Sequence, residues 1–308
     1  MPIETFAQMV ERARESGPTR IAVAAAADRE VLRAVAQALA EGIAEATLVG
    51  DRTEIERIQS ELDLDLGRAT ILDQPDSKRA AFEVIGMAAQ GQAEVVVKGQ
   101  LKTSELLGAA LRSEGGLRKQ ALITHVGIFE IPLVDRLIYI SDSGVVLYPD
   151  IYQKLEIIQN AVEVARAFGI GRPHVAVLSA SEDVDPSRPV SIEGLALSRM
   201  ARQGWVENAV VAGPMALDVA ISMQSARVKG IVGPVAGQAD ILIVPNVEAG
   251  NVMAKSIQYF GHGRMAGLVV GARVPILISS RADSAETRFL SLAMATILAS
   301  HRRLPQHS

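Results

Sequence analysis

The chain has 308 residues, enough for about two domains, with 49% hydrophobic residues, 21% charged residues and a net charge of −4. This balance is typical of a globular protein, and it gives no electrostatic reason to expect a nucleic acid or a membrane surface as a partner. The absence of cysteine excludes disulfides, thiolate metal sites and a cysteine nucleophile. No apolar run approaches the roughly 20 residues of a membrane span and no signal peptide is visible, so we expect a cytoplasmic protein.

Strands and helices are expected to alternate along the chain, because β-branched apolar runs are followed by segments with apolar residues at helical spacing. Buried strands are predicted at residues 20–26, 45–50, 69–72, 93–99, 125–131, 136–141, 174–179, 209–213, 240–245 and 274–278. Helices are predicted at residues 5–16, 29–41, 53–62, 77–90, 150–169, 191–204, 251–261 and 284–300. This alternation favours an α/β fold of three-layer αβα architecture with mostly parallel sheets.

Ser280 and Arg281 stand where the last apolar run ends and the final helix is about to begin. The first turn of a helix that follows a strand offers unpaired N–H donors and a positive dipole end, and an arginine adds a bidentate donor for phosphate. The segment therefore predicts an anionic, phosphorylated substrate. The nearby acids Asp283 and Glu286 have a second interpretation, because they could form a capping box at the start of the helix.

A similar arrangement follows the strand at residues 93–99. Lys98 and Gly99 end the strand, and Thr103 or Ser104 is expected to cap the next helix. A glycine turn, a lysine and a helix N-terminus together suit an anion. An ordinary strand-to-helix loop with a good cap explains the same residues without a ligand.

Further candidate binding residues lie elsewhere in the chain. Gly237 closes a glycine-rich segment that would let the backbone approach a ligand closely. Glu248 follows a strand, Asn251 is expected to cap the next helix, and Lys255 lies one turn further on. Such polar strand ends converge on the ligand site of an α/β sheet, and capping with an exposed carboxylate is an equal explanation. Arg118 is either a second phosphate clamp or a solvated loop arginine.

Several short motifs follow one another in a fixed order: Lys98-Gly99, Thr103-Ser104, Gly116-Leu117-Arg118, Leu178 to Glu182, Gly213-Pro214, Pro234 to Leu242, Pro245 to Asn251 and Ser280 to Asp283. Together they resemble the phosphate acetyl/butyryltransferase family, and more closely its butyryltransferase branch. No single motif is specific, but the ordered set extends over essentially the whole chain.

The resemblance implies a reversible reaction in which acyl-CoA and inorganic phosphate give acyl phosphate and CoA, with an acetyl or butyryl group. It implies two α/β domains similar to isocitrate dehydrogenase, residues 1–149 with 266–308 and residues 150–265, with the active site in the cleft between them. It further implies a homodimer, no metal in the active site and no bound cofactor. CoA is then a substrate that supplies the sulfur nucleophile itself.

By the same resemblance, Arg281 clamps phosphate and Ser280 contacts the reacting groups. The acetyltransferase branch places an aspartate base about six residues after this arginine, where the present chain has Thr287. Either Glu286 or Asp283 then takes the role of the base, or the ionisation of CoA itself suffices. The residues assigned to substrate binding are Lys98, Gly99, Thr103, Ser104, Arg118, Gly237, Glu248, Asn251 and Lys255.

Two other functions compete with acyl transfer. One is a non-catalytic module of the same fold that senses acyl-CoA or acyl phosphate; the missing aspartate favours it and the Ser280-Arg281 pair opposes it. The other is a dehydrogenase of the isocitrate dehydrogenase architecture. That enzyme would need a cluster of metal-binding aspartates, whereas Asp142, Asp218 and Asp240 are scattered along the sequence.

Overall fold

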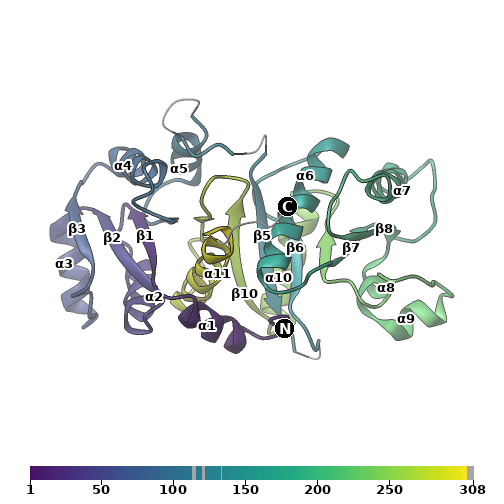
Figure 1. Ribbon diagram of the computed structural model, residues 1–308, viewed down its shortest axis with the longest axis horizontal. Helices are drawn as coiled ribbons and strands as arrows, with labels where there is room; N and C mark the ends of the chain where they lie inside the picture. Colours follow the sequence, from purple (N-terminus) through teal and green to yellow (C-terminus); the bar gives the residue numbers. More distant parts are fainter. Residues whose placement is uncertain (113–115, 120–121, 133, 304–308) are drawn as a thin grey trace. The chain divides into compact units, whose positions relative to one another are not determined.

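A computed structural model describes residues 1–112, 116–119, 122–132 and 134–303 (Figure 1). The chain divides into two compact units: unit 1 contains Met1–Thr5 and Leu122–Met265, and unit 2 contains Phe6–Ala121 and Ala266–Ser308. Each unit combines helices with a mostly parallel set of strands, so the predicted α/β fold class is confirmed. Within the described ranges, none of the helices is both long and apolar enough to cross a membrane.

Unit 2 is built around strands in the order β3-β2-β1-β4-β11-β10, of which only β10 runs antiparallel to its neighbour. Its strands are β1 (Thr19–Ala24), β2 (Ala44–Gly50), β3 (Thr70–Asp73), β4 (Val95–Lys98), β11 (Ile276–Leu277) and most of β10 (Arg264–Val270). Its helices are α1 (Phe6–Glu15), α2 (Arg29–Ala40), α3 (Arg52–Glu61), α4 (Ser77–Ala89), α5 (Thr103–Ala110) and α11 (Ala285–Arg303). Every residue of β4 is buried, as expected for a parallel strand covered by helices on both faces.

The connections of unit 2 reverse direction beside β1. The chain proceeds from β1 to β2 and β3, which lie side by side in Figure 1, and then returns to place β4 on the other side of β1. In open α/β sheets, ligands bind outside the carboxyl ends of the strands at such a switch point. The topology of unit 2 therefore directs attention to the loops that follow β1 and β4.

Unit 1 contains strands in the order β5-β6-β9-β7-β8, and only β5 and β6 are antiparallel to one another. Its strands are β5 (Thr124–Glu130), β6 (Ile138–Ser141), β7 (His174–Leu178), β8 (Val210–Met215) and β9 (Ile241–Ile243). Its helices are α6 (Ile151–Ala167), α7 (Pro189–Arg202), α8 (Leu217–Ile221), α9 (Met223–Val228) and α10 (Val247–Tyr259). The short helices α8 and α9 were not expected from the sequence.

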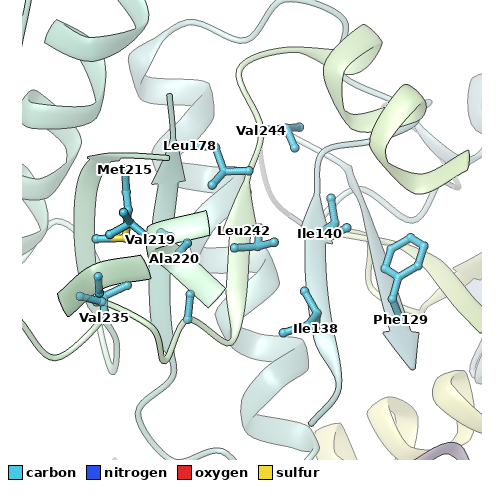
Figure 2. Packing of buried hydrophobic residues seen from close by; sticks show 14 of the residues in the cluster. Phe129, Ile138, Ile140, Leu178, Met215, Val219, Ala220, Val235, Leu242 and Val244 are labelled. Atoms are coloured by element: carbon cyan, nitrogen blue, oxygen red, sulfur yellow. The ribbon is translucent and has the colours of Figure 1, made fainter. Parts of the chain in front are cut away.

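The core of unit 1 follows the two-residue alternation of its strands. Ile138 and Ile140 of β6 lie on the same side as Leu242 of β9, where they pack with Val219 of α8 (Figure 2). The intervening residue Tyr139 faces the opposite side, where its ring meets Phe168 at the end of α6 edge-on, with 6.1 Å between ring centroids. Helices thus cover both faces of this sheet, which makes unit 1 a three-layer αβα structure.

Two details differ from the sequence-based expectations. The predicted domain boundary near residue 150 lies inside unit 1, because β6 pairs with β9 in one sheet. The expected strand at residues 274–278 is reduced to the two-residue β11, and the longer β10 precedes it. Gly271, with φ +94°, begins the turn that separates β10 from β11.

Candidate active site

A cavity of about 580 Å³ lies in unit 2 at the carboxyl ends of β1, β4 and β11. The residues that line it are Asp28, Ser77, Lys98, Gly99, Gln100, Leu101, Lys102, Glu105, Ser279, Arg281 and Arg288. Four of these side chains are cationic and two are acidic, so positive charge is in excess. The cavity occupies the switch point of the strand order and suits an anion in both position and charge.

Lys98 is the last residue of β4, and it is only 8% exposed. Its Nζ donates hydrogen bonds to the carbonyl oxygens of Gly99 and Leu101, both at 3.1 Å, and so holds the loop that follows the strand. Burial lowers the pKa of the Lys98 ammonium, and the Arg288 guanidinium lowers it further, while Asp28 opposes the shift. Lys98, which the sequence analysis assigns to substrate binding, thus lies at the cavity wall.

Gly99 is required by a close approach of two loops. Its N–H donates to the carbonyl oxygen of Ala24 at 2.8 Å, and the N–H of Gln100 donates to that of Ala25 at 2.7 Å. A Cβ at position 99 would lie 2.1 Å from the Ala25 oxygen, which no side chain tolerates. The loop after β4 is therefore fastened to the loop after β1, and Gly99 serves this contact rather than a left-handed turn.

The start of α5 differs from the sequence-based expectation. Neither Thr103 nor Ser104 caps the helix: the N-cap is Lys102, which makes no capping hydrogen bond with its side chain, and Thr103 is the first helical residue. The Glu105 carboxylate instead accepts from the N–H of Lys102 at 3.3 Å. Lys102 and Glu105 line the cavity, whereas Thr103 and Ser104 lie beside it in the first turn.

Ser280 to Asp283 form a turn that carries Arg281. The N–H of Asp283 donates to the Ser280 carbonyl oxygen at 3.1 Å, and the Asp283 carboxylate accepts from the N–H of Ser280 at 2.7 Å. Ser284 precedes the first residue of α11 and caps the helix by accepting from the N–H of Thr287 at 3.2 Å. Arg281 is exposed, lines the cavity and makes no hydrogen bond within the described ranges.

Arg288, which the sequence reasoning missed, holds this turn from α11. The side chain is 5% exposed and donates to the carbonyl oxygens of Asp283 and Ser280 and to the Asp28 carboxylate, each at 3.3 Å. Asp28 also caps α2 by accepting from the N–H of Val31, as its position in the sequence suggests. A cation in the first turn of a helix opposes the helix dipole. An arginine in the first turn of a predicted helix is therefore the sequence signal by which Arg288 could have been found.

Ser279 contributes a second feature that the sequence reasoning missed. It lines the cavity, and its Oγ is buried without a hydrogen-bond partner among the described residues. A buried hydroxyl without a partner is costly and calls for an explanation. A phosphate or carbonyl oxygen in the cavity would supply the missing acceptor. Ser280, which the family resemblance favours for this contact, does not line the cavity.

The remaining residues predicted in unit 2 lie outside the cavity wall. Glu286 is exposed in the first turn of α11, and neither it nor Asp283 lines the cavity. The backbone of Arg118 pairs with Ala272, in the connection that precedes β11. That connection lies at the amino end of β11, whereas the cavity lies at the carboxyl ends, so Arg118 is not brought to this cavity.

Three residues predicted in unit 1 gather on one face of α10. Glu248, Asn251 and Lys255 are spaced by three and four residues, and Glu248 accepts a hydrogen bond from Tyr148, which raises the pKa of the Tyr148 hydroxyl. The expected cap at Asn251 is wrong, because Asn246 caps α10 by accepting from the N–H of Ala249 at 3.0 Å. Lys255 donates to Gln258 at 3.2 Å.

Gly237, the fourth residue predicted in unit 1, occupies a tight turn. Its φ of +75° favours glycine, and a Cβ there would lie 2.6 Å from the Cα of Met223. Its N–H donates to the Val219 carbonyl oxygen at 2.7 Å. These contacts explain the glycine by packing against α8 and α9, without a ligand.

The sequence model of the phosphate acetyl/butaryl transferase family matches residues 5–85 and 78–296. The chain belongs to this family. A phosphate butyryltransferase of Clostridium acetobutylicum is 38% identical over 300 residues, 97% of this chain and 100% of that protein. A phosphate acetyltransferase of Rhizobium meliloti is 40% identical over 301 residues, 98% of this chain and 95% of that protein. The family predicted from the sequence is thus confirmed, and the protein is an acyltransferase.

Solved structures agree with this membership. A branched-chain phosphotransacylase from Enterococcus faecalis V583 has a TM-score of 0.82 and 30% identity, and the match covers 91% of this chain and 99% of that one. A phosphotransacetylase from Streptococcus pyogenes has the same TM-score of 0.82 at 20% identity, covering 96% of this chain and 99% of that one, and it supports the fold alone. Since relatives named for acetyl and butyryl transfer are almost equally identical, the identities do not choose between the two branches.

Proposed function

We infer that the protein transfers a short-chain acyl group between CoA and inorganic phosphate, with the phosphate held in the cavity of unit 2. The observation that carries this proposal is the cavity at the switch point of unit 2, where Lys102, Arg281 and the buried Arg288 outnumber the two acidic side chains even without Lys98. A phosphate dianion would neutralise this excess. The exposed Arg281 would close on it from the turn after β11, where a bidentate guanidinium stabilises charge on the transferred group.

The reaction needs no nucleophile from the protein. In one direction the sulfur of CoA attacks the carbonyl carbon of an acyl phosphate, the carbon–sulfur bond forms, the carbon–oxygen bond to phosphate breaks, and the thiol proton must leave. The protein has to bind both anionic partners, orient them and handle that proton. Orientation can contribute several kcal/mol to lowering the barrier, and a positioned proton acceptor roughly 10²–10⁴-fold in rate.

The test is release of CoA from acetyl-, propionyl- and butyryl-CoA with inorganic phosphate present or replaced by sulfate. The chain contains no cysteine, so a thiol reagent detects CoA without a background from the protein. Turnover that requires phosphate, with equimolar acyl phosphate formed, supports the proposal, and the order of the three substrates identifies the acyl group. Acyl-CoA binding without turnover would favour the non-catalytic module instead.

We also propose that the enzyme acts as a cytoplasmic homodimer without a bound cofactor. The apolar side chains of Val252 and Tyr259 are exposed one above the other on α10, with Phe260 beside them at 83% exposure. An interface with a second copy would bury them. Light scattering of the purified protein tests the dimer, and a monomeric mass across the micromolar range would contradict it.

A further inference from the structure

The amine of Lys98 is held in a defined orientation. Its Nζ uses two positions to donate to the carbonyl oxygens of Gly99 and Leu101, both at 3.1 Å, and it makes no other hydrogen bond within the described part of the chain. A neutral amine has two N–H donors and one lone pair. With both donors engaged by residues of the cavity wall, the remaining position carries the lone pair in the neutral form and an N–H in the charged form.

The surroundings of Lys98 favour the neutral form more than water does. The side chain is buried, and two arginines act on it: Arg288 from α11 and Arg281 from the turn after β11. Asp28, from the loop after β1, acts in the opposite direction, while Lys102 and Glu105 at the start of α5 line the same cavity. Burial lowers the pKa of Lys98 from its usual value, and the Arg288 guanidinium lowers it further.

Two carboxylates nearby already accept hydrogen bonds from the protein. Asp28 accepts from the N–H of Val31 and from Arg288, and Asp283 accepts from the N–H of Ser280. Thr287, which stands where the acetyltransferase branch has its aspartate, does not line the cavity. Lys98 is therefore a titratable group at the cavity wall whose surroundings favour the neutral form, which can accept a proton.

We propose that Lys98 carries the proton of the acyl transfer between the thiol of CoA and the oxygen of phosphate. This role rests on the proposed function. The neutral amine takes the thiol proton as sulfur bonds to the carbonyl carbon, and the resulting ammonium gives that proton to the phosphate oxygen as the carbon–oxygen bond breaks. The products are acyl-CoA and hydrogen phosphate, and Lys98 returns to its neutral form. In the opposite direction the amine takes the proton of hydrogen phosphate and delivers it to the departing thiolate.

The experiment compares wild type with Lys98→Ala, Lys98→Met and Lys98→Arg, and uses Lys119→Met, an exposed lysine outside the cavity, as the matched control. We expect kcat to fall by roughly 10²–10⁴-fold in all three Lys98 variants and to stay at the wild-type level in Lys119→Met. Lys98→Arg keeps the charge but cannot release a proton near neutrality, so it separates proton transfer from mere attraction of phosphate. Added methylamine or ethylamine should restore Lys98→Ala in proportion to the concentration of free base.

Several outcomes would overturn the proposal. One is a folded Lys98→Arg enzyme with more than a tenth of the wild-type kcat. Another is a rescued Lys98→Ala rate that increases with the concentration of the protonated amine instead of the free base. If these variants do not fold, the wild type decides. The reaction of acyl-CoA with phosphate is measured, because this direction has no free thiol among its substrates. Its kcat must rise with pH as Lys98 loses its proton, and a kcat that does not change with pH contradicts the role of Lys98. A wild type without phosphate-dependent CoA release would refute the proposed function itself.

Discussion

Replacing Arg288 by methionine should cost both stability and activity, because this side chain joins three parts of unit 2. It donates to the carbonyl oxygens of Ser280 and Asp283 and to the Asp28 carboxylate, each at 3.3 Å. Hydrogen bonds to charged groups contribute about 1.5–3 kcal/mol each, but these are long, and removing a buried charge recovers part of its desolvation cost. Asp28 retains 23% of its side-chain exposure, so water can solvate it once the arginine is gone.

We therefore expect Arg288→Met to lower the free energy of unfolding by about 2–4 kcal/mol. For a unit of this size, that corresponds to a fall in the melting temperature of roughly 5–10 °C. The turn that presents Arg281 would also lose two of its anchors. Since a displacement of about 1 Å can cost 10²-fold in rate, kcat/KM for phosphate should fall by a similar factor.

Arg281→Met is the matched control, because Arg281 lines the same cavity but is exposed and makes no hydrogen bond in the described structure. It should leave stability within about 0.5 kcal/mol of wild type while reducing kcat/KM by 10²-fold or more. Urea unfolding and phosphate-dependent CoA release measure the two effects. An Arg288→Met protein as stable as wild type would refute the anchoring role, and equal losses of stability in both variants would refute the distinction between the arginines.

Three further predictions concern the cavity wall. Gly99→Ala should destabilise the fold by about 1–3 kcal/mol, because its Cβ would lie 2.1 Å from the Ala25 oxygen. The control Gly108→Ala, which has open space around position 108 in α5, should be neutral or stabilising. Thermal unfolding of the two variants measures the difference. Ser279→Ala should leave stability unchanged or raise it, because the change removes a buried hydroxyl without a partner. The same variant should lower kcat/KM for phosphate about tenfold or more. Activity equal to that of wild type would contradict ligand binding by Ser279. The pKa of Lys98 is lowered in the folded protein, so the unfolded chain binds more protons between that pKa and 10.5. The free energy of unfolding of wild type relative to Lys98→Met should therefore rise with pH in this window. Unfolding measured at several pH values would show a constant difference between the two proteins if the shift is absent.

The general architecture could be predicted from the sequence because its signals are local. Runs such as Val95 to Lys98 and the caps that start helices, such as Asp28, depend on neighbours within a few residues, and both were placed correctly. Local signals also compete: Asn246 and Asn251 both precede apolar residues, and only the structure shows that Asn246 caps α10. The position of Lys98 and Arg281 at strand ends was likewise accessible from local pattern and family resemblance.

The contacts that organise the cavity depend on residues far apart in the chain and could not be predicted in this way. Arg288 and Asp28 are separated by 260 positions, so nothing in the sequence near either residue indicates the ion pair. The sequence predicts Gly99 as a turn glycine, but the reason for a glycine at this position is the close approach of the loop at Ala25. Ser280 is exposed and the hydroxyl oxygen of Ser279 is buried, and this difference follows from how the chain leaves the short strand β11.

The departure from the acetyltransferase pattern at Thr287 allows a last test of which group carries the proton. The Thr287 hydroxyl lies 3.3 Å from that of Ser284 at the start of α11, and Thr287 is absent from the cavity wall. A carboxylate introduced there should stay beside the helix N-terminus, where the dipole stabilises it. We therefore expect the double variant Lys98→Met/Thr287→Asp to be as slow as Lys98→Met alone in CoA release. Recovery of more than tenfold would show that position 287 reaches the substrates, and Lys98 would then no longer be needed as the proton carrier.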